Sequence, residues 1–495
     1  MGVIKHSLTF SLATFLSRIF GYVRDAIIAY YFGASQITDA FFIAFRLPNT
    51  FRRLLGEGGF NAAFIPIYAR RKDKEFLSSA FTYYALANIL ITLLGILLSE
   101  HIITLIAPGI RGRPYFELAV FMSRWLFTYT LFVGLSSFFM AVLNTRGVFF
   151  IPAFAQAVFN IFFSFLVILF AKHFGYYSLI VGVLLGGVAQ LLFNLPSFLK
   201  LGTGLRISLK IDEDMILLVK RLFPALLGFG VAQLSFFIDT FLASFLTTGS
   251  VSYLYYANRL FQLPLGAVSV GVANSLLSVI SGGGNAKDNT LLAFRFILLV
   301  SIPASFGLLV MSDYIVAFLY GRGRFKGEDI LVSSVVLRAY ALGLVFFSLQ
   351  KVISSIFFAK GDTKTPVKAS FVSILSEGIS ACFYTFFLGW GAVGLSLGTS
   401  TSSFIGFSYL FLRARGNGVH IKDVLSILPK PLVASLIMVV TVLFMKHFLA
   451  RPEYTLIIVP VAMVVYFIAL MFLKESLSLL AFSRFNGLVK KKTGP

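Results

Sequence analysis

The sequence is poor in cysteine, histidine and charged residues. It contains one cysteine, Cys382, and five histidines among 495 residues, and only 13% of its residues are charged. A single cysteine excludes an intramolecular disulfide framework and a cysteine-based metal site. So little charge cannot cover the surface of a soluble domain, and we therefore expect most of the surface to face lipid.

Long apolar runs recur from one end of the chain to the other, and 58% of the residues are hydrophobic. Each run has about 20 residues or more, which is enough to cross roughly 30 Å of hydrocarbon as a helix. The runs do not alternate between polar and apolar residues, as the strands of a membrane barrel do. The sequence therefore predicts an all-α polytopic membrane protein, because helices satisfy every backbone group within lipid.

We expect about fourteen transmembrane helices. Glycine and proline punctuate the turns between the apolar runs. The predicted spans are 7–32, 38–69, 77–106, 116–144, 150–172, 177–200, 213–247, 251–281, 290–319, 329–359, 364–388, 391–413, 423–448 and 454–473.

The chain carries 42 basic and 20 acidic residues, a formal net charge of +22. Most of this excess lies in alternate short loops, such as Arg70 to Lys74 and Arg413 to Arg415, which indicates that these loops are cytoplasmic. An even number of spans then places both termini in the cytoplasm. The basic loop 320–328 is the exception to this pattern. We expect the anionic partners to be lipid headgroups rather than nucleic acid.

Several polar and turn-forming residues recur at a fixed offset of 214 residues, which indicates an internal duplication. We predict two six-helix lobes, 1–212 and 213–422, with the same orientation and a central cavity between them. Residues 423–495 then form two additional spans and a basic tail. The matched pairs are Asp25 with Asp239, Arg124 with Arg338, Gly147 with Gly361, Pro152 with Pro366 and Gly175 with Gly389.

The first span contains three charged residues, Arg18, Arg24 and Asp25. Each costs roughly 2.5–3.5 kcal/mol at the centre of a bilayer, so such residues usually face a polar cavity or a charged partner. Gly21 lies between them and weakens the helix at that level. We predict that the two arginines bind an anionic ligand and that Asp25 acts as a gate or binds a coupling ion.

The second span combines Asp39 and Arg52 with residues that disturb a helix. Pro48 removes one helical hydrogen bond, and the pair Gly58 and Gly59 adds a second weak point, so we predict hinges at both. Arg52 is a further candidate ligand for the anion, with a snorkelling interfacial arginine as the alternative.

The second lobe has its own buried charges. Arg259 occupies the repeat position of Arg46, and Asn258 precedes it in the same span. The candidates for gating or ion coupling, besides Asp25, are Asp39 of the first lobe and Asp239, Asn258 and Glu377 of the second. An ion pair between Arg259 and a carboxylate of the first lobe, Asp25 or Asp39, is the alternative to ligand binding.

The surplus of buried arginine points to the chemical class of the ligand. Guanidinium groups stay charged when buried and bind phosphate oxygens through two parallel hydrogen bonds. A site for organic cations would instead need a majority of carboxylates. We therefore predict a diphosphate ligand held by Arg24, Arg52, Arg259 and Arg18.

Several motifs in the first seventy residues, and one in the eighth span, resemble those of the MurJ (MviN) family of lipid II flippases. The resemblance extends over essentially the whole chain, and the N-terminal motifs are the specific ones. They are Ser17 to Asp25, Phe32 to Ala34, Thr38 to Phe41, Leu47 to Asn49, Arg52-Arg53, Glu57 to Phe60, Phe64 to Pro66 and Tyr256 to Leu260.

This resemblance implies the fold of the multidrug/oligosaccharidyl-lipid/polysaccharide exporter superfamily and export of lipid II across the bacterial inner membrane. Lipid II is undecaprenyl diphosphate carrying a peptidoglycan disaccharide-pentapeptide. Arg24, Arg52 and Arg259 match arginines of the family's cavity, and Asn258 stands where members commonly have aspartate. Spans 423–473 match the pair that forms a groove for the lipid tail.

Some members of this family bind sodium, which implies Asp239 and Thr399 as candidate ligands here. We expect no resident cofactor, and a sodium ion, a proton or the membrane potential as the energy source. No nucleotide-binding motif is visible: Gly321 to Arg324 is glycine-rich but lacks the lysine and serine or threonine of a P-loop.

Three other functions remain as alternatives. One is export of another polyprenyl-linked glycan, and the second is antiport of drugs or cations. The third is a membrane enzyme such as a glycosyltransferase or phosphatase, which would need paired acids or histidines on long loops. The loops between these spans are short, so we expect a transporter and not an enzyme. We also expect the protein to be monomeric.

Overall fold

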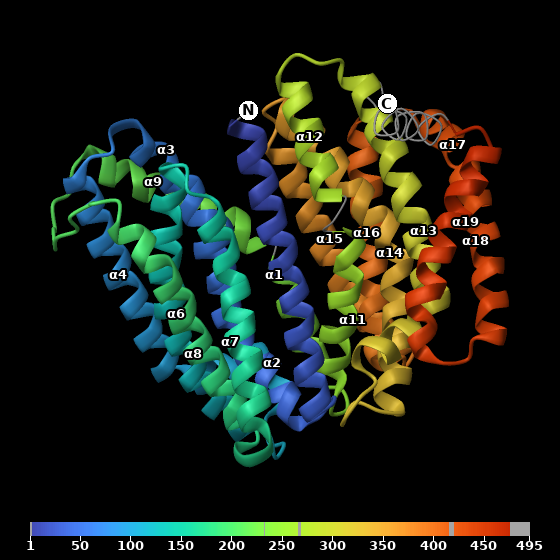
Figure 1. The fold of residues 1–495 in the computed structure, drawn as a ribbon, viewed down its shortest axis with the longest axis horizontal. Coiled ribbons are helices and arrows are strands. Elements are labelled where there is room, and N and C mark those ends of the chain that lie inside the picture. Colours follow the sequence, from blue (N-terminus) through green and yellow to red (C-terminus); the bar gives the residue numbers. More distant parts are fainter. Residues whose placement is uncertain (1, 232, 266–268, 415–419, 476–495) are drawn as a thin grey trace, which may run out of the picture. The chain divides into compact units, whose positions relative to one another are not determined.

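The computed structural model describes residues 2–231, 233–265, 269–414 and 420–475, and every regular element in these ranges is helical (Figure 1). This confirms the predicted all-α fold. The helices are α1 (Gly2–Phe32), α2 (Gln36–Arg52), η1 (Arg53–Gly58), α3 (Gly59–Arg71), α4 (Lys74–Leu97), α5 (Ser99–Ile106), η2 (Pro108–Ile110), α6 (Phe116–Thr145), α7 (Phe150–Phe174), α8 (Tyr177–Leu199), α9 (Glu213–Val231), α10 (Leu234–Ala243), α11 (Ser250–Pro264), α12 (Val270–Ser281), α13 (Ala286–Tyr320), α14 (Glu328–Ala359), α15 (Lys364–Cys382), η4 (Phe383–Phe387), α16 (Gly391–Ala414), α17 (Ile421–Ile427), α18 (Pro429–Phe448), η6 (Pro452–Tyr454) and α19 (Thr455–Phe472).

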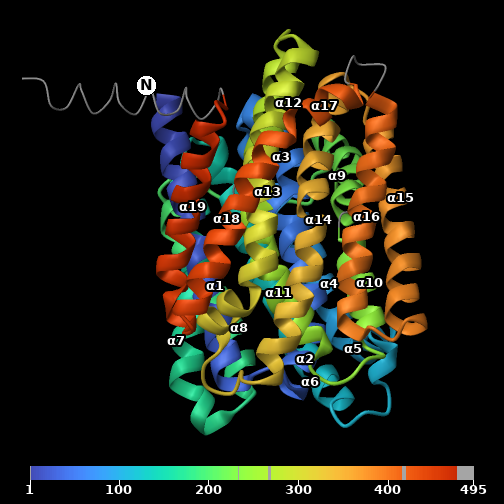
Figure 2. The same ribbon diagram turned by 90° about the vertical axis from the view of Figure 1, so that its right-hand side faces the viewer.

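Each of the fourteen predicted spans corresponds to one helix or to two or three consecutive helical pieces. In the described part of the chain, nine helical segments are by themselves long and apolar enough to cross a membrane. Most of the other predicted spans are broken into shorter helices. Within each unit the long helices run nearly parallel or antiparallel, as the side view shows (Figure 2).

The second span is interrupted in the way that its sequence suggests. Pro48 lies inside α2, and the π-helical turn η1 follows Arg52 and ends at Gly58. A Cβ atom on Gly59 would lie 2.8 Å from Cδ2 of Leu226 in α9 and 2.9 Å from the carbonyl oxygen of Leu54. Glycine is therefore favoured at 59, chiefly by the close approach of the backbone oxygen of Leu54.

The predicted seventh and eighth spans, 213–247 and 251–281, each contain two helices rather than one. The seventh consists of α9 and α10, and the eighth of α11 and α12. Pro264 ends α11, as a residue without a backbone N–H commonly does. The breaks at 53–58 and after 264 occur in corresponding spans of the two predicted lobes.

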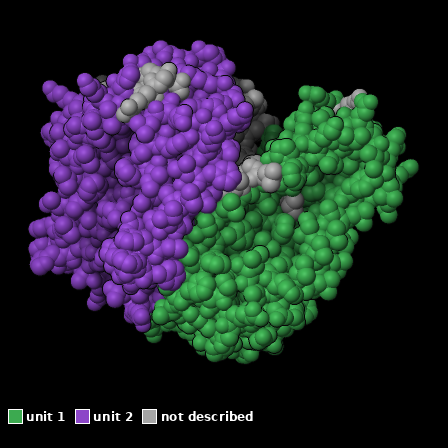
Figure 3. All heavy atoms as spheres, turned by 180° about the vertical axis from the view of Figure 1, so that it is seen from behind, with its two compact units in different colours: residues 1–252, 322–326 green, residues 253–321, 327–495 purple. Residues whose placement is uncertain are grey.

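The chain divides into two compact units, which Figure 3 shows in different colours. Unit 1 contains residues 1–252 and 322–326, and unit 2 contains residues 253–321 and 327–495. Helices α9 and α10 therefore pack with unit 1, although the internal repeat assigns them to the second lobe. The lobes are defined by duplication rather than by packing, so their boundaries stay a prediction.

Unit 1 has an aromatic core between α3, α4 and α6. Phe60 stacks on Phe64 with a centroid distance of 5.0 Å, and Phe138 contacts both rings. The short segment 322–326 also packs in this unit, where the N–H of Arg324 donates to the carbonyl oxygen of Tyr30 at 2.8 Å. This bond caps the C-terminus of α1 and fixes part of the unexpectedly basic loop.

In unit 2 the helices α18 and α19 pack beside each other, and both contact α13 (Figure 1). Nζ of Lys446 in α18 lies 2.9 Å from both carboxylate oxygens of Asp313 in α13. Further along α13, Arg295 donates to the buried carboxylate of Glu475, which follows α19. Ionic contacts thus attach the two additional helices to α13 at two levels.

Candidate functional site

The guanidinium group of Arg24 is buried and bound to its neighbour in the chain, Asp25. Nε and Nη2 of Arg24 donate to Oδ1 of Asp25 at 3.0 and 2.7 Å. Asp25 is completely buried, and Arg24 is 9% exposed. A buried arginine and a buried aspartate are each costly alone, so their pairing explains how both are tolerated in α1.

A second contact holds Arg24 against α7. Its Nη1 donates to Oδ1 of Asn160 at 3.3 Å, and Nδ2 of Asn160 donates to the carbonyl oxygen of Ser17 at 3.2 Å. The amide of Asn160 therefore accepts on one side and donates on the other, which fixes its orientation. The ring of Phe163, one turn further on, lies 5.8 Å from Cζ of Arg24.

Arg52 at the end of α2 is likewise held by amide oxygens. Its Nε donates to Oδ1 of Asn49 at 3.0 Å, and its Nη1 donates to Oε1 of Gln156 in α7 at 3.1 Å. Arg52 is therefore hydrogen-bonded within unit 1.

The two arginines meet the same helix one turn apart. Gln156, which binds Arg52, and Asn160, which binds Arg24, are separated by four residues on α7. Residues with this spacing share one face of a helix, about 6 Å apart along its axis. The structure therefore brings together two of the predicted diphosphate ligands from α1 and α2, on a common support.

Two further arginines of unit 1 gather around the start of α10. Nη1 of Arg53 donates to Oε1 of Gln233 at 3.2 Å. The guanidinium groups of Arg53 and Arg46 lie 5.2 and 5.9 Å from the ring centre of Phe236, within the range of cation–π attraction. This cluster holds the π-helical turn η1 against the break between α9 and α10.

Arg18 is the predicted ligand that the structure does not bring to this place. Its side chain is exposed, and it has no hydrogen bond or ion pair among the described residues. Gly21, the predicted weak point of the same helix, is buried within a continuous α1. Their predicted roles in binding and bending stay predictions.

Asp39 binds the first turn of α11 within unit 1. Its Oδ2 accepts from the N–H of Gly249 at 2.6 Å, and its Oδ1 accepts from the N–H and the hydroxyl of Ser252 at 2.9 and 2.6 Å. A carboxylate at a helix N-terminus is favoured by both the hydrogen bonds and the helix dipole.

The same turn is held from its other side by Arg113, which precedes α6. The guanidinium group donates to the carbonyl oxygens of Leu246 and Phe245 at 2.5 and 3.1 Å. Arg113 and Asp39 together bind the segment 245–252 at its carbonyl and amide ends. Sequence reasoning missed Arg113, because nothing in its loop pattern indicates what it binds.

The candidate residues for gating and ion coupling lie in different units. In unit 2 the buried Glu377 accepts a hydrogen bond from Oγ1 of Thr399 at 3.1 Å. In unit 1 Asp239 is buried in α10. Among the described residues no three histidine, cysteine, aspartate or glutamate side chains form a metal-binding group, and the sodium site stays a prediction.

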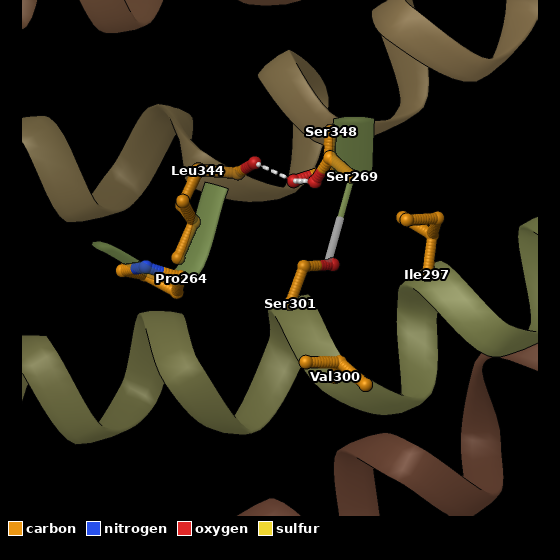
Figure 4. Close-up of a pocket in the computed structure, with 7 residues that line it drawn as sticks. All are labelled: Pro264, Ser269, Ile297, Val300, Ser301, Leu344 and Ser348. Carbon is orange, nitrogen blue, oxygen red and sulfur yellow. Dashed lines mark hydrogen bonds between the residues drawn. The ribbon is translucent and has the colours of Figure 1, made fainter. Parts of the chain in front are cut away.

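Arg259 and Asn258 lie on α11 in unit 2. Gln262, one turn further, donates through Nε2 to Oδ1 of Asn258. Arg259 is partly buried. A small recess lies beside the break after α11, where Ser269 and Ser348 are joined by a hydrogen bond of 2.9 Å and Ser301 points towards them (Figure 4). Among the described residues, it has no room for a water molecule.

Sequence reasoning also missed the amides that hold the arginines, namely Asn49, Gln156 and Asn160. A signal for two of them was present. Gln156 and Asn160 are polar residues four apart in an otherwise apolar span, and this spacing places them on one helix face. What they bind could not be read from the sequence, because their partners lie more than 100 residues away.

Two features of the structure define the class of protein. The chain forms two compact bundles of membrane-length helices, and side-chain amides hydrogen-bond arginines within unit 1. This is the architecture of a polytopic helical membrane transporter. A family model described as "Lipid II flippase MurJ" matches residues 28–465. The chain belongs to this family, as the N-terminal motifs predicted.

Individual relatives agree with this assignment. The chain is 36% identical over 482 residues to a "Probable lipid II flippase MurJ" of Aquifex aeolicus, covering 97% of this chain and 96% of the relative. It is 33% identical over 441 residues to a "Lipid II flippase MurJ" of Burkholderia cenocepacia, covering 85% of each chain.

Solved structures show the same fold. A structure described as "Lipid II flippase MurJ, inward closed conformation" has a TM-score of 0.84 and 31% identity, and the match covers 95% of this chain and 99% of that one. A MATE family transporter of the MOP superfamily has a TM-score of 0.69 over 83% of this chain and 95% of its own, at 14% identity. The similarity to the MATE transporter shows only that the two proteins share a fold, as the resemblance of the N-terminal motifs implied.

Proposed function

We propose that this protein transfers lipid II from the cytoplasmic to the outer leaflet of the bacterial inner membrane by alternating access. The observation that carries the proposal is that Arg24 of α1 and Arg52 of α2 bind residues one turn apart on α7, in a chain of this family. Lipid II carries two adjacent phosphates, so two neighbouring guanidinium groups match its charge and its geometry.

Binding to arginine would offset the free-energy cost of removing the charged headgroup from water. A diphosphate in a low-dielectric site needs fixed positive charge, and arginine stays protonated there. Arg259 of unit 2 is proposed to bind the same headgroup during part of the cycle. Because Asp25 already engages Arg24, we propose that a phosphate oxygen displaces this carboxylate, which makes Asp25 a gate residue.

The two additional helices, α18 and α19, are proposed to guide the polyprenyl tail. Both expose large apolar side chains, among them Leu443, Phe444 and Ile468. We propose the membrane potential or a coupling ion as the energy source, with Asp239, Glu377 and Thr399 as candidate ion ligands. The protein is proposed to act as a monomer with both termini in the cytoplasm.

The test is the accessibility of the lipid II headgroup in proteoliposomes that contain only the purified protein. Labelled lipid II should become accessible on the opposite face faster than in protein-free liposomes, and an imposed membrane potential should change the rate. An Arg24→Ala protein reconstituted at equal density is the control. Transfer of a different polyprenyl-linked glycan, or of an organic cation, without transfer of lipid II would contradict the proposal.

A further inference from the structure

Arg24 and Arg52 are held against one face of α7 by two neutral amides, Asn160 and Gln156. Gln156 accepts from Arg52 at 3.1 Å, and Asn160 accepts from Arg24 at 3.3 Å. A neutral acceptor orients a guanidinium group without cancelling its charge, whereas a carboxylate would do both. The positive potential of Arg52 and Arg24 thus remains greater than it would be with acidic partners on α7.

Asn160 is built into the structure more firmly than Gln156. It is 3% exposed, and its amide nitrogen also donates to the carbonyl oxygen of Ser17 in α1. Neither hydrogen bond of Asn160 could be reproduced by leucine or alanine, which are typical of lipid-spanning helices. A buried amide costs free energy unless it is bonded, so its position here has to be explained by what it binds.

A third polar residue, Ser164, lies on the same face of α7 as Gln156 and Asn160, but it makes no such contact within the described part of the chain. Ser164 lies one turn beyond Asn160 on α7 and is buried, but its hydroxyl has no hydrogen-bond partner among the described residues. Of the three polar residues on this face of α7, only Gln156 and Asn160 bind arginines of the described ranges. Ser164 provides a matched control on the same helix face.

We infer that Gln156 and Asn160 are positioning residues, which set Arg52 and Arg24 about one helical turn apart so that they bind the two phosphates of a diphosphate together. This inference rests on the proposed function, which supplies the diphosphate. It adds that the spacing of the two cations is set by α7 rather than by α1 and α2, which carry them. α2 ends at Arg52, and the π-helical turn η1 begins at the next residue, Arg53.

A double-mutant cycle with the full-length protein in nanodiscs and fluorescent lipid II tests the inference. We expect Asn160→Ala to weaken binding about tenfold, as expected for loss of a hydrogen bond to a charged group. In an Arg24→Lys background the same change should cost less than twofold, because the lysine cannot make this contact. In an Arg52→Lys background the cost should stay about tenfold.

Gln156→Ala should show the opposite pattern, with an effect of about fivefold that disappears in the Arg52→Lys background. Ser164→Ala should bind like the wild-type protein. An equal loss for Asn160→Ala in all three backgrounds would mean that Asn160 acts on the stability of α1 and α7 and would overturn the inference. Unchanged binding for both alanine variants would overturn it as well.

The two proposals can fail separately in this experiment. If the wild-type protein binds a different polyprenyl diphosphate but not lipid II, and the cycles keep the expected pattern, the proposed function fails and the positioning role stands. If the wild-type protein binds lipid II and the cycles show no coupling, the function stands and the positioning role fails.

Discussion

The carboxylate of Asp25 and the guanidinium of Arg24 form an ion pair between chain neighbours, with Nη2 of Arg24 2.7 Å from Oδ1 of Asp25. Both donors of Arg24 in this pair bind the same oxygen. A ligand phosphate that binds Arg24 through Nε and Nη2 has to displace Asp25. The pair therefore couples the binding of an anion to the release of a buried carboxylate.

Replacing Arg24 tests this coupling directly. We expect Arg24→Ala to abolish growth of a flippase-depleted strain; because it also leaves the buried Asp25 without this partner, growth is compared at equal amounts of protein in the membrane. Arg24→Lys should restore growth only in part, because an ammonium group keeps the charge but loses the planar fork. Growth rates and membrane immunoblots are the measurements. Equal growth with lysine and arginine would show that only the charge matters.

The hydrogen bonds of Asp39 predict a stabilising role for this residue. Asp39→Asn replaces one oxygen by a donor that faces the N–H of Gly249 or Ser252. We expect a loss of about 1–3 kcal/mol in the free energy of unfolding, as for a buried donor left without an acceptor. Thermal unfolding in detergent measures it, with Ser252→Ala as a milder control. A variant as stable as wild type would contradict this account of Asp39.

The two ionic contacts that attach α18 and α19 to α13 should differ in strength. Glu475 is 2% exposed, so Arg295→Met leaves a buried carboxylate with reduced compensation and should cost about 3 kcal/mol. Asp313 is 41% exposed, so Lys446→Met should cost at most about 1 kcal/mol. Denaturant titration followed by limited proteolysis within 449–454 compares the two. A larger loss of stability for Lys446→Met than for Arg295→Met would contradict the conclusion that the buried contact is the stronger one.

The cap of α4 predicts a dependence of stability on pH. The carboxylate of Asp73 accepts from the N–H groups of Phe76 and Glu75. The hydrogen bond from Phe76, above all, lowers the pKa of Asp73 below its ordinary value of 3.8. A group with a lowered pKa in the folded state stabilises the fold above its unfolded pKa, and this contribution disappears as the pH falls through the folded value.

We therefore expect Asp73→Ala to cost about 1 kcal/mol at neutral pH and progressively less below pH 3.8. Asp73→Asn keeps a capping oxygen that does not titrate, so its stability should lie near wild type at neutral pH and should not change through this residue in acid. Melting temperatures measured between pH 3 and pH 7 give the comparison. A loss of stability in Asp73→Ala that grows as the pH falls would contradict a lowered pKa of Asp73 in the folded protein.

Gly59 should not tolerate a side chain. In Gly59→Ala the new methyl group would lie 2.8 Å from Cδ2 of Leu226 and 2.9 Å from the carbonyl oxygen of Leu54. The leucine side chain can move, but the backbone oxygen cannot, so we expect a loss of about 1–3 kcal/mol in stability. Gly147→Ser, at a position with open space but positive φ, is the comparison for backbone strain without a clash.

The predictions from sequence succeeded where the physical signal was local. Apolar runs of sufficient length predicted the spans, and Pro48 and Gly58-Gly59 marked a real interruption of the second one. The division of the seventh and eighth spans into two helices each was not predicted, because a break such as that between α9 and α10 depends on how the segments pack and leaves the hydropathy unchanged. The N-terminal motifs predicted the family, which the comparisons confirmed.

By itself, the sequence determined that the chain is a helical membrane protein with costly buried charges, because hydropathy and span length act through the solvent at each segment independently. Only the tertiary structure decided how those charges are satisfied. Gln156 and Asn160 of α7 bind two arginines from separate helices, Arg52 and Arg24. Hydrogen bonds act over about 3 Å, and folding alone brings residues more than 100 positions apart within that distance.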